Sequence, residues 1–511
     1  MSILLIYPPV AKLSEPPAGI ARLAGTLRSH GVACGSVDLN LLGMLDLFEK
    51  APRGEDTWSR RALKSCSSHL DELRSKAIYQ SPARYQRAVN DLNRVVSISS
   101  AGFDSEISLA NYSEGARSPL KSSDLLQAAE HFSDNLFFPS FSSRLDKLIE
   151  SQSPRFIGIS FSYLSQALTG FAIIGFLKEN YPGLQVIAGG GLVTSWMNNP
   201  HWNEPFSTLL DLCVKGVGEQ DLLQLFQRKQ TTGWGTPDYD DFRQNHYLSP
   251  GLILPYAASD GCYWKKCTFC PDKAEDTPYI QTQPSRVSEE IRELGSRYKP
   301  SLLHLLDNAL SPRVLNNFID FPPGLPWYGF SRFEKDLEDP EFCRDLRQSG
   351  CVMLKLGLES GSQHVLDQMN KGIELELVSR ILLNLRLAGI STYVYLLFGT
   401  PSETGDDACL TLAYVRKHHQ EITFLNLAIF NMPVCSPEAE AIENRFSEGD
   451  LSLYCDFTHP FGWDRKGVRT FLHKSFRKDP LINTIIQRDP PFFTSNHAPL
   501  FSLARAGWMS G

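Results

Sequence analysis

The stretch Ser259-Asp260-Gly261-Cys262-Tyr263-Trp264-Lys265-Lys266-Cys267-Thr268-Phe269-Cys270 decides how the rest of this sequence is interpreted. It follows directly on an apolar run, residues 252–258, which predicts a buried strand. The cysteines should therefore lie on a loop at the carboxyl end of a strand, where α/β folds build their active sites. Three thiolates are one fewer than the four that saturate a metal centre. A metal cluster held by these cysteines would keep one coordination position free.

Size and composition restrict the class of protein. A chain of 511 residues with 42% hydrophobic residues is expected to form two or three domains with substantial cores. The net charge of −7 argues against broad nucleic-acid affinity, which depends on Lys and Arg. The eleven cysteines are odd in number and mostly scattered, so they do not resemble a disulfide framework. There is no basic signal-peptide region and no run of 18 apolar residues, so we expect a cytoplasmic protein without a membrane span.

The first part of the chain alternates between apolar runs and helical periodicity. This pattern predicts a doubly wound, Rossmann-like α/β domain over residues 1–228. A Ser-rich, charged and largely helical insertion interrupts it at about residues 40–154. The predicted strands are residues 3–7, 32–39, 156–161, 184–188 and 212–215.

A polar stretch with several Gly and Pro, residues 229–250, is the predicted linker. A second series of strand-then-helix units follows over residues 251–430 and predicts a partial, open (β/α)6 barrel of the TIM type. The last segment, residues 431–511, is irregular and rich in Pro and Phe, and is expected to be a small extension that caps the barrel mouth. The predicted barrel strands are residues 252–258, 302–306, 327–330, 352–357, 392–398 and 423–429.

The cysteine loop resembles that of the radical S-adenosylmethionine superfamily, in which three cysteines ligate a 4Fe–4S cluster on a partial (β/α) barrel. Phe269 fits the aromatic position common there, and Gly261-Cys262-Tyr263-Trp264 is similar to the cobalamin-binding members. The spacing is C-x4-C-x2-C, whereas C-x3-C-x2-C is commonest in the superfamily. The alternative is a zinc site, which usually needs four ligands, often as paired C-x2-C knuckles. Only one such pair is present, although a distant cysteine could complete the set.

The resemblance also implies contacts to S-adenosylmethionine from later strand ends. Three of these contacts also have an ordinary structural interpretation. Glu359 could be a surface or helix-capping carboxylate, and Arg332 could form a structural ion pair. The turn at Gly399 could be an ordinary strand-to-helix connection. The usual Gly-Gly-Glu signature is absent, and Asp307 is the polar group in its place. The implied S-adenosylmethionine contacts are Phe269, Asp307, Arg332, Glu359, Ser360, Gly399 and Pro401.

The amino-terminal domain resembles a cobalamin-binding fold, because Ser162-Tyr163-Leu164 and Gly189-Gly190 follow successive strands. The histidine that often ligates cobalt from below is missing from the loop after the first strand, residues 8–13, which leaves Tyr7, Tyr163 or water to face the metal. The alternative is a vestigial sheet that only stabilises the barrel. The implied cobalamin contacts are Tyr7, Ser162, Tyr163, Leu164, Gly189, Gly190, Gly191, Gly216, Gly218 and Glu219.

By this resemblance the chain is expected to be an enzyme with a 4Fe–4S cluster, S-adenosyl-L-methionine and cobalamin as cofactors. The implied reaction is methyl transfer to an unactivated carbon through a 5′-deoxyadenosyl radical and methylcobalamin, with flavodoxin or ferredoxin as reductant. No residue is assigned a catalytic role, and the substrate could be a small molecule, a lipid or a peptide. The alternatives are a cyclisation or rearrangement with the same cofactors, a tRNA methylthiotransferase, and a zinc-stabilised interaction module.

Overall fold

The computed structural model describes residues 2–229, 234–244, 246–441, 444–445 and 448–507 of the chain. These residues form two compact units. Unit 1 comprises Met1–Gly251 and Glu448–Leu453, and unit 2 comprises Leu252–Ser447 and Tyr454–Gly511. Parts of the predicted linker, residues 230–233 and 245, and of the carboxyl-terminal extension, residues 442–443, 446–447 and 508–511, lie outside the described residues.

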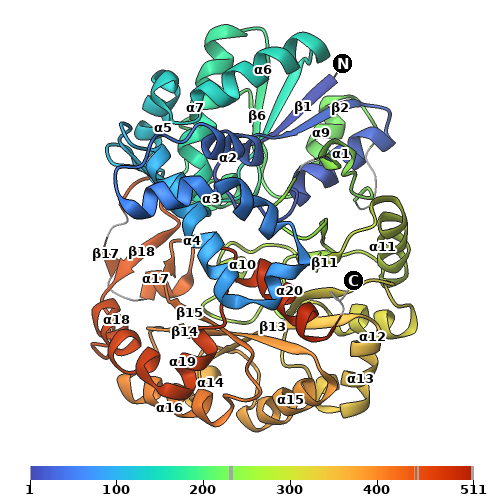
Figure 1. Ribbon diagram of the computed structural model, residues 1–511, viewed down its shortest axis with the longest axis vertical. Helices are drawn as coiled ribbons and strands as arrows, with labels where there is room; N and C mark the ends of the chain where they lie inside the picture. Colours follow the sequence, from blue (N-terminus) through green and yellow to red (C-terminus); the bar gives the residue numbers. More distant parts are fainter. Residues whose placement is uncertain (1, 230–233, 245, 442–443, 446–447, 508–511) are drawn as a thin grey trace. The chain divides into compact units, whose positions relative to one another are not determined.

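Unit 1 is built on a five-stranded sheet with the order β2-β1-β5-β6-β7 (Figure 1). All its neighbouring strands pair in parallel, and the order reverses between β1 and β5, as the doubly wound prediction requires. The apolar residues of the inner strands β1, β5 and β6 are buried on both faces, which is typical of parallel sheets covered by helices. The strands are β1 (Ser2–Tyr7), β2 (Ala33–Asp38), β5 (Phe156–Ser160), β6 (Gln185–Gly189) and β7 (Leu212–Cys213), and the helices between them are α1 (Ala18–Ser29), α7 (Ala167–Asn180), α8 (Gly191–Asn198) and α9 (Glu219–Leu225).

The insertion between β2 and β5 is mainly helical. It also contains an antiparallel hairpin, β3 (Ser105–Ile107) with β4 (Tyr112–Glu114), which the sequence pattern did not indicate. Strands of three residues are too short to display an alternating pattern. The helices of the insertion are α2 (Leu39–Glu49), α3 (Thr57–Leu73), α4 (Pro82–Ser99), α5 (Ser122–Glu130) and α6 (Phe138–Gln152).

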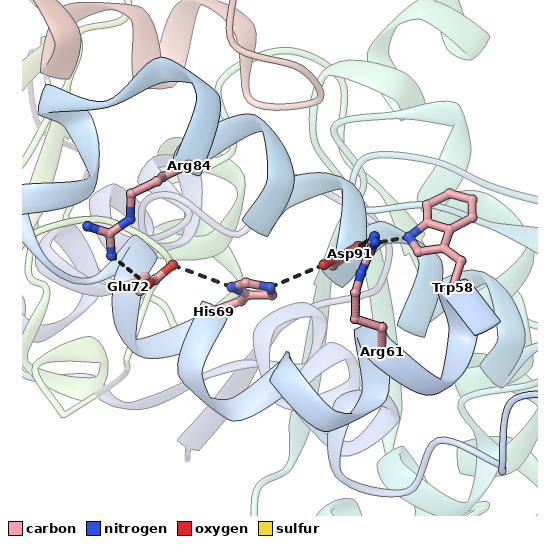
Figure 2. A network of polar contacts seen from close by, with 6 residues as sticks. All are labelled: Trp58, Arg61, His69, Glu72, Arg84 and Asp91. Carbon is pink, nitrogen blue, oxygen red and sulfur yellow. Dashed lines mark hydrogen bonds and ion pairs between the residues drawn. The ribbon is translucent and has the colours of Figure 1, made fainter.

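A chain of polar contacts joins α3 to α4 inside the insertion (Figure 2). The His69 ring lies between two carboxylates, with Nδ1 3.4 Å from Glu72 and Nε2 3.2 Å from Asp91. Asp91 is 2% exposed and also accepts hydrogen bonds from Trp58 at 2.7 Å and Arg61 at 3.0 Å. A buried carboxylate with three donors stabilises the pairing of these two helices.

Unit 2 is built on a six-stranded parallel sheet with the order β15-β14-β13-β12-β11-β8 (Figure 1). The strands follow one another in sequence, with helices in the connections, and within the described residues the edge strands β8 and β15 do not pair with each other. This is the open (β/α)6 arrangement that the sequence predicts. The strands are β8 (Ile253–Tyr256), β11 (Leu302–Leu305), β12 (Trp327–Ser331), β13 (Cys351–Glu359), β14 (Ser391–Phe398) and β15 (Phe424–Ile429), and the connecting helices are α11 (Pro284–Tyr298), α12 (Pro312–Asp320), α13 (Pro340–Gln348), α14 (Gln363–Gln368), α15 (Leu375–Ala388) and α16 (Gly405–Lys417).

The segment after β15 adds short elements, among them a separate antiparallel sheet with the order β16-β18-β17. Its last helix, α20, packs against β13 and β14, and seven consecutive residues of α20, 497–503, are buried. The elements are β16 (Met432–Pro433), α17 (Pro437–Ala441), β17 (Asn444–Arg445), β18 (Tyr454–Phe457), α18 (Arg465–Lys474), α19 (Pro480–Ile486) and α20 (Thr494–Arg505). Among the described residues of the whole chain, no helix is long and apolar enough to cross a membrane.

Candidate active site

The cysteine loop begins where β8 ends, and Asp307 holds its start in place. Asp307 lies just after β11, is 1% exposed, and accepts hydrogen bonds from the Ala258 amide at 3.0 Å and the Ser259 hydroxyl at 2.6 Å. Burial raises the pKa of Asp307 to about 6, although these hydrogen bonds oppose the shift. Gly261 then takes a positive φ of 71° and passes close to the backbone of Pro278. Asp307 therefore ties the ends of two adjacent strands together and directs the chain into the loop.

The three cysteines lie near one another on this loop, and all three are free thiols. Cys267 is 8% exposed, and it interacts electrostatically with both Cys262 and Cys270. Burial raises the pKa of the Cys270 thiol to about 11 and also raises that of Cys267. In the part of the chain that the structure describes, no group of three or more His, Cys, Asp or Glu side chains is arranged to hold a metal ion.

Two cations come close to Cys267 from other parts of unit 2. Arg332 follows β12, and its Nη1 donates to the Cys267 sulfur at 4.0 Å. Lys371, after α14, forms an ion pair with Glu359 at 2.7 Å, and both side chains are buried. Both positive charges oppose the rise in the pKa of the Cys267 thiol that burial causes. The two cations thus offset part of the cost that burial imposes on a negatively charged Cys267 sulfur.

Glu359 and Ser360 end β13 at the same edge of the sheet. Glu359 takes a positive φ of 66°, and its ion pair with Lys371 lies over Gly357, where a Cβ would come within 2.3 Å of the carboxylate. Ser360 is fully buried and bonds to Thr411 of α16 at 3.2 Å. In this structure, therefore, both predicted cofactor contacts are engaged with protein groups.

The turn after β14 carries Gly399 and Pro401. Gly399 has a φ of 80°, and its amide donates to the carboxylate of Glu403. Trp463 donates to the same carboxylate at 2.9 Å, and His459 bonds to the Thr400 carbonyl at 2.8 Å. Burial raises the pKa of Glu403 to about 7. Residues of the carboxyl-terminal extension thus hold the turn in place.

Phe269, the residue before the third cysteine, lies beside this extension as well. It packs against a small apolar cluster formed by Phe430, Met432 and Ala439. Its ring is also 5.4 Å from the Lys371 ammonium group. The aromatic residue therefore joins the cysteine loop to the segment that follows β15.

In unit 1, the predicted cobalamin contacts gather at the carboxyl edge of the sheet. Burial raises the pKa of Tyr7, at the end of β1, well above its usual value, and Ser162 and Tyr163 are its neighbours. Tyr163 is 56% exposed, and Leu164 begins the short helical turn that leads into α7. Gln166 holds the two loops together, because it accepts from the Ser162 and Tyr163 amides and donates to the Pro8 carbonyl.

The glycines along this edge have two different roles. Gly190 has a φ of 99°, and a Cβ there would lie 2.4 Å from the Phe161 carbonyl oxygen, so it permits close backbone packing. Gly191 and Gly216 have nothing within 4 Å of the Cβ position, whereas Gly189 and Gly218 are in ordinary contact with Val214. Glu219 is 1% exposed and forms an ion pair with Arg22 of α1 at 2.6 Å. The open faces of Gly191 and Gly216 leave room for a ligand at the sheet edge.

Several residues of the site were not found by sequence reasoning. Lys371 joins the site through its buried ion pair with Glu359, and Trp463 through a hydrogen bond to Glu403, 60 positions away. Trp264 belongs to the Gly261-Cys262-Tyr263-Trp264 motif, but the motif did not reveal its contacts with Arg332 and with Asn370, 106 positions away. The only local signal is Gly372, whose φ of 67° lets the chain turn against Trp264. Contacts of this kind have no sequence period, so no motif reveals them.

No protein-family model matches this chain. It is 28% identical over 148 residues to bacteriochlorophyllide d C-8(2)-methyltransferase of Chlorobaculum tepidum, and 26% identical over 183 residues to anaerobic magnesium-protoporphyrin IX monomethyl ester cyclase of Rubrivivax gelatinosus. These matches cover 29% and 34% of this chain, but only 30% and 32% of the two relatives.

Solved structures resemble nearly the whole chain. The cobalamin-dependent S-adenosylmethionine radical enzyme OxsB, with aqua-cobalamin bound, is similar with a TM-score of 0.57 at 12% identity, over 90% of this chain and 64% of that one. The radical S-adenosylmethionine methyltransferase TsrM from Kitasatospora setae, with cobalamin and a 4Fe–4S cluster bound, has a TM-score of 0.52 at 15% identity, over 88% and 82%. This chain therefore has the fold of the cobalamin-dependent radical S-adenosylmethionine enzymes.

Proposed function

We propose that this chain is a cobalamin-dependent radical S-adenosylmethionine enzyme that transfers a methyl group to an unactivated carbon. The observation that carries this proposal is the position of three free thiols on one loop, at the carboxyl end of the first strand of an open six-stranded parallel sheet. The fold shared with OxsB and TsrM supports the same assignment. An interaction module stabilised by zinc would need neither the six-stranded sheet of unit 2 nor the doubly wound sheet of unit 1.

The cysteine loop is suited to an iron–sulfur cluster rather than to a single metal ion, around which no three of the described side chains are arranged. Cys262, Cys267 and Cys270 would hold it, and Arg332 and Lys371 place positive charge beside Cys267. When bound, such a cluster supplies one electron to S-adenosylmethionine. Three protein thiolates leave one iron for that cofactor, and the protein's own part is to orient it and to exclude competing reactions.

The edge of the sheet in unit 1 is suited to cobalamin. Gly191 and Gly216 have open space where other residues carry a side chain, and the exposed ring of Tyr163 lies at the same edge. When bound, cobalamin supplies a carrier for the methyl group. Gln166 would keep the two loops beneath it in fixed positions through its bonds to Ser162, Tyr163 and Pro8.

We further propose that the segment after β15 caps the barrel and shapes its substrate side. Trp463 and His459 support the turn at Gly399, and Asp489 and Ser495 lie near Tyr393 and Tyr395 of β14. A cytoplasmic location accords with the eleven free cysteines, and the proposed cluster would need an electron donor such as flavodoxin or ferredoxin.

The test compares Cys267→Ala with Cys409→Ser, a change of an exposed cysteine on α16. The proteins are purified without oxygen, reconstituted with iron, sulfide and cobalamin, and assayed for each component. We expect Cys267→Ala to lose the cluster absorbance but to keep its cobalamin, and Cys409→Ser to keep both. Loss of cobalamin together with the cluster in Cys267→Ala would contradict the assignment of the two cofactors to separate units.

The similarity to a magnesium-protoporphyrin ester cyclase favours a second candidate, a ring-forming reaction without methyl transfer. S-adenosylmethionine labelled in its methyl group distinguishes the two reactions. Methyl transfer produces 5′-deoxyadenosine, S-adenosylhomocysteine and a labelled product, whereas cyclisation produces 5′-deoxyadenosine without S-adenosylhomocysteine and leaves the product unlabelled. Because both sequence relatives are named for tetrapyrrole substrates, a magnesium porphyrin is the first substrate to test.

A further inference from the structure

The guanidinium group of Arg332 is engaged with protein groups on all three of its nitrogens. Arg332 is 6% exposed, and its three nitrogens donate to three different partners. Nη2 donates to the Lys371 carbonyl at 2.5 Å, Nε to Glu334 at 3.2 Å, and Nη1 to the Cys267 sulfur at 4.0 Å. The side chain therefore joins the end of β12, the segment after α14, and the cysteine loop.

The plane of the Arg332 guanidinium also lies over the Trp264 ring, 4.2 Å from its centre. The indole donates in turn to the Asn370 carbonyl at 3.1 Å. Tyr263 bonds at 2.7 Å to Glu334, the carboxylate that also holds Arg332. Two aromatic residues of the loop, next to Cys262 in sequence, are thus fixed around one arginine.

The contact with sulfur has a consequence for a cluster bound by this loop. Hydrogen bonds to cysteine sulfurs and nearby positive charge stabilise the reduced, more negative state of an iron–sulfur cluster, so they raise its reduction potential. Arg332 supplies both effects at Cys267, while Lys371 contributes charge and is itself balanced by Glu359. Lysine would preserve the charge of Arg332 but not its planar fork of donors.

We propose that Arg332 is a positioning residue for the cluster, which fixes the cysteine loop through Trp264 and Lys371 and raises the reduction potential through its N–H donation to Cys267. This inference rests on the proposed function, because it requires a cluster on the three thiols. It assigns Arg332 to the cluster rather than to S-adenosylmethionine.

The test measures the midpoint potential of the reconstituted cluster by a redox titration followed by electron paramagnetic resonance. We expect Arg332→Gln to shift the potential to a more negative value, and Arg332→Lys to lie between this variant and the wild type. Arg344→Gln is the matched control, because Arg344 is an exposed arginine of α13 in the same unit, and it should leave the potential unchanged. Iron and sulfide content is measured for every variant.

The outcomes separate the inference from the function. Clusters in all the proteins with equal potentials would overturn the role of Arg332 and leave the proposed function intact. Absence of a cluster from the wild-type protein would instead overturn the proposed function. If Arg332→Gln takes up no cluster, Arg332→Lys decides the matter, and a wild-type potential in that variant would overturn the role of the donor fork.

Discussion

Replacing Gly372 with alanine should destabilise the cysteine loop, although Gly372 is not part of that loop. Gly372 has a φ of 67°, and a Cβ at this position would lie 2.2 Å from the Trp264 ring. The left-handed backbone costs a residue with a side chain roughly 1–2 kcal/mol, and overpacking against the indole adds about 1–3 kcal/mol. We therefore expect Gly372→Ala to lose about 2–5 kcal/mol of unfolding free energy and to displace Trp264.

Gly389→Ala is the matched control for the backbone contribution. Gly389 has a φ of 76° at the end of α15 in the same unit, and its nearest atom lies 3.8 Å from the Cβ position. This variant should lose only the roughly 1–2 kcal/mol that the backbone conformation costs. Urea denaturation gives the free energies, and iron and sulfide assays after reconstitution give the occupancy of the loop, which should fall in Gly372→Ala alone.

The double variant Trp264→Ala with Gly372→Ala tests the cause directly. Removal of the indole removes the atoms that the new methyl group meets, so the two changes should couple by about 1–3 kcal/mol. Equal stabilities of Gly372→Ala and Gly389→Ala would refute the reasoning. So would an extra cost of Gly372→Ala that persists unchanged when Trp264 is absent.

Two further predictions concern buried carboxyl groups. Asp91→Ala should cost about 3 kcal/mol in urea denaturation, because His69, Arg61 and Trp58 lose a common acceptor; a loss below about 1 kcal/mol would show that the contacts in Figure 2 contribute little. Burial raises the pKa of Glu403 to about 7, whereas the unfolded chain releases this proton near pH 4.5. Between about pH 4.5 and 7 the folded protein therefore binds one more proton than the unfolded chain, and the unfolding free energy falls as the pH rises through this range. From pH 5 to 8, the melting temperature should therefore fall more steeply for the wild type than for Glu403→Gln. Parallel curves of melting temperature against pH would contradict this assignment.

The strands of both sheets could be predicted because parallel strands are nearly continuous apolar runs. The run at residues 352–357, for example, lies within β13. The sequential order of the strands in the sheet of unit 2 agrees with the general rule that successive strand-then-helix units share one handedness. The sequence did not reveal that residues 448–453 belong to unit 1, where the Leu451 amide donates to the Leu120 carbonyl at 2.9 Å, because such long-range contacts leave no local pattern.

The cysteines were predictable for a different reason than the residues around them. The spacing of the cysteines is a local property of one loop. Lys371 and Trp264, in contrast, contact residues that are distant in sequence and come close only in the folded chain. Arg332 was expected either at the cofactor or in a structural ion pair, and the structure places it against Glu334 and Cys267. Asp307 was identified as the polar group after its strand, and the structure gives it two hydrogen bonds to the start of the cysteine loop.

The most direct measurement is the metal content and spectrum of the anaerobically purified protein, with and without S-adenosylmethionine. A three-thiolate site predicts iron and acid-labile sulfide in the ratio of a 4Fe–4S cluster, and a reduced-cluster resonance that changes when S-adenosylmethionine occupies the open iron. Zinc bound without sulfide, or a cluster resonance that does not change when S-adenosylmethionine is added, would contradict the account.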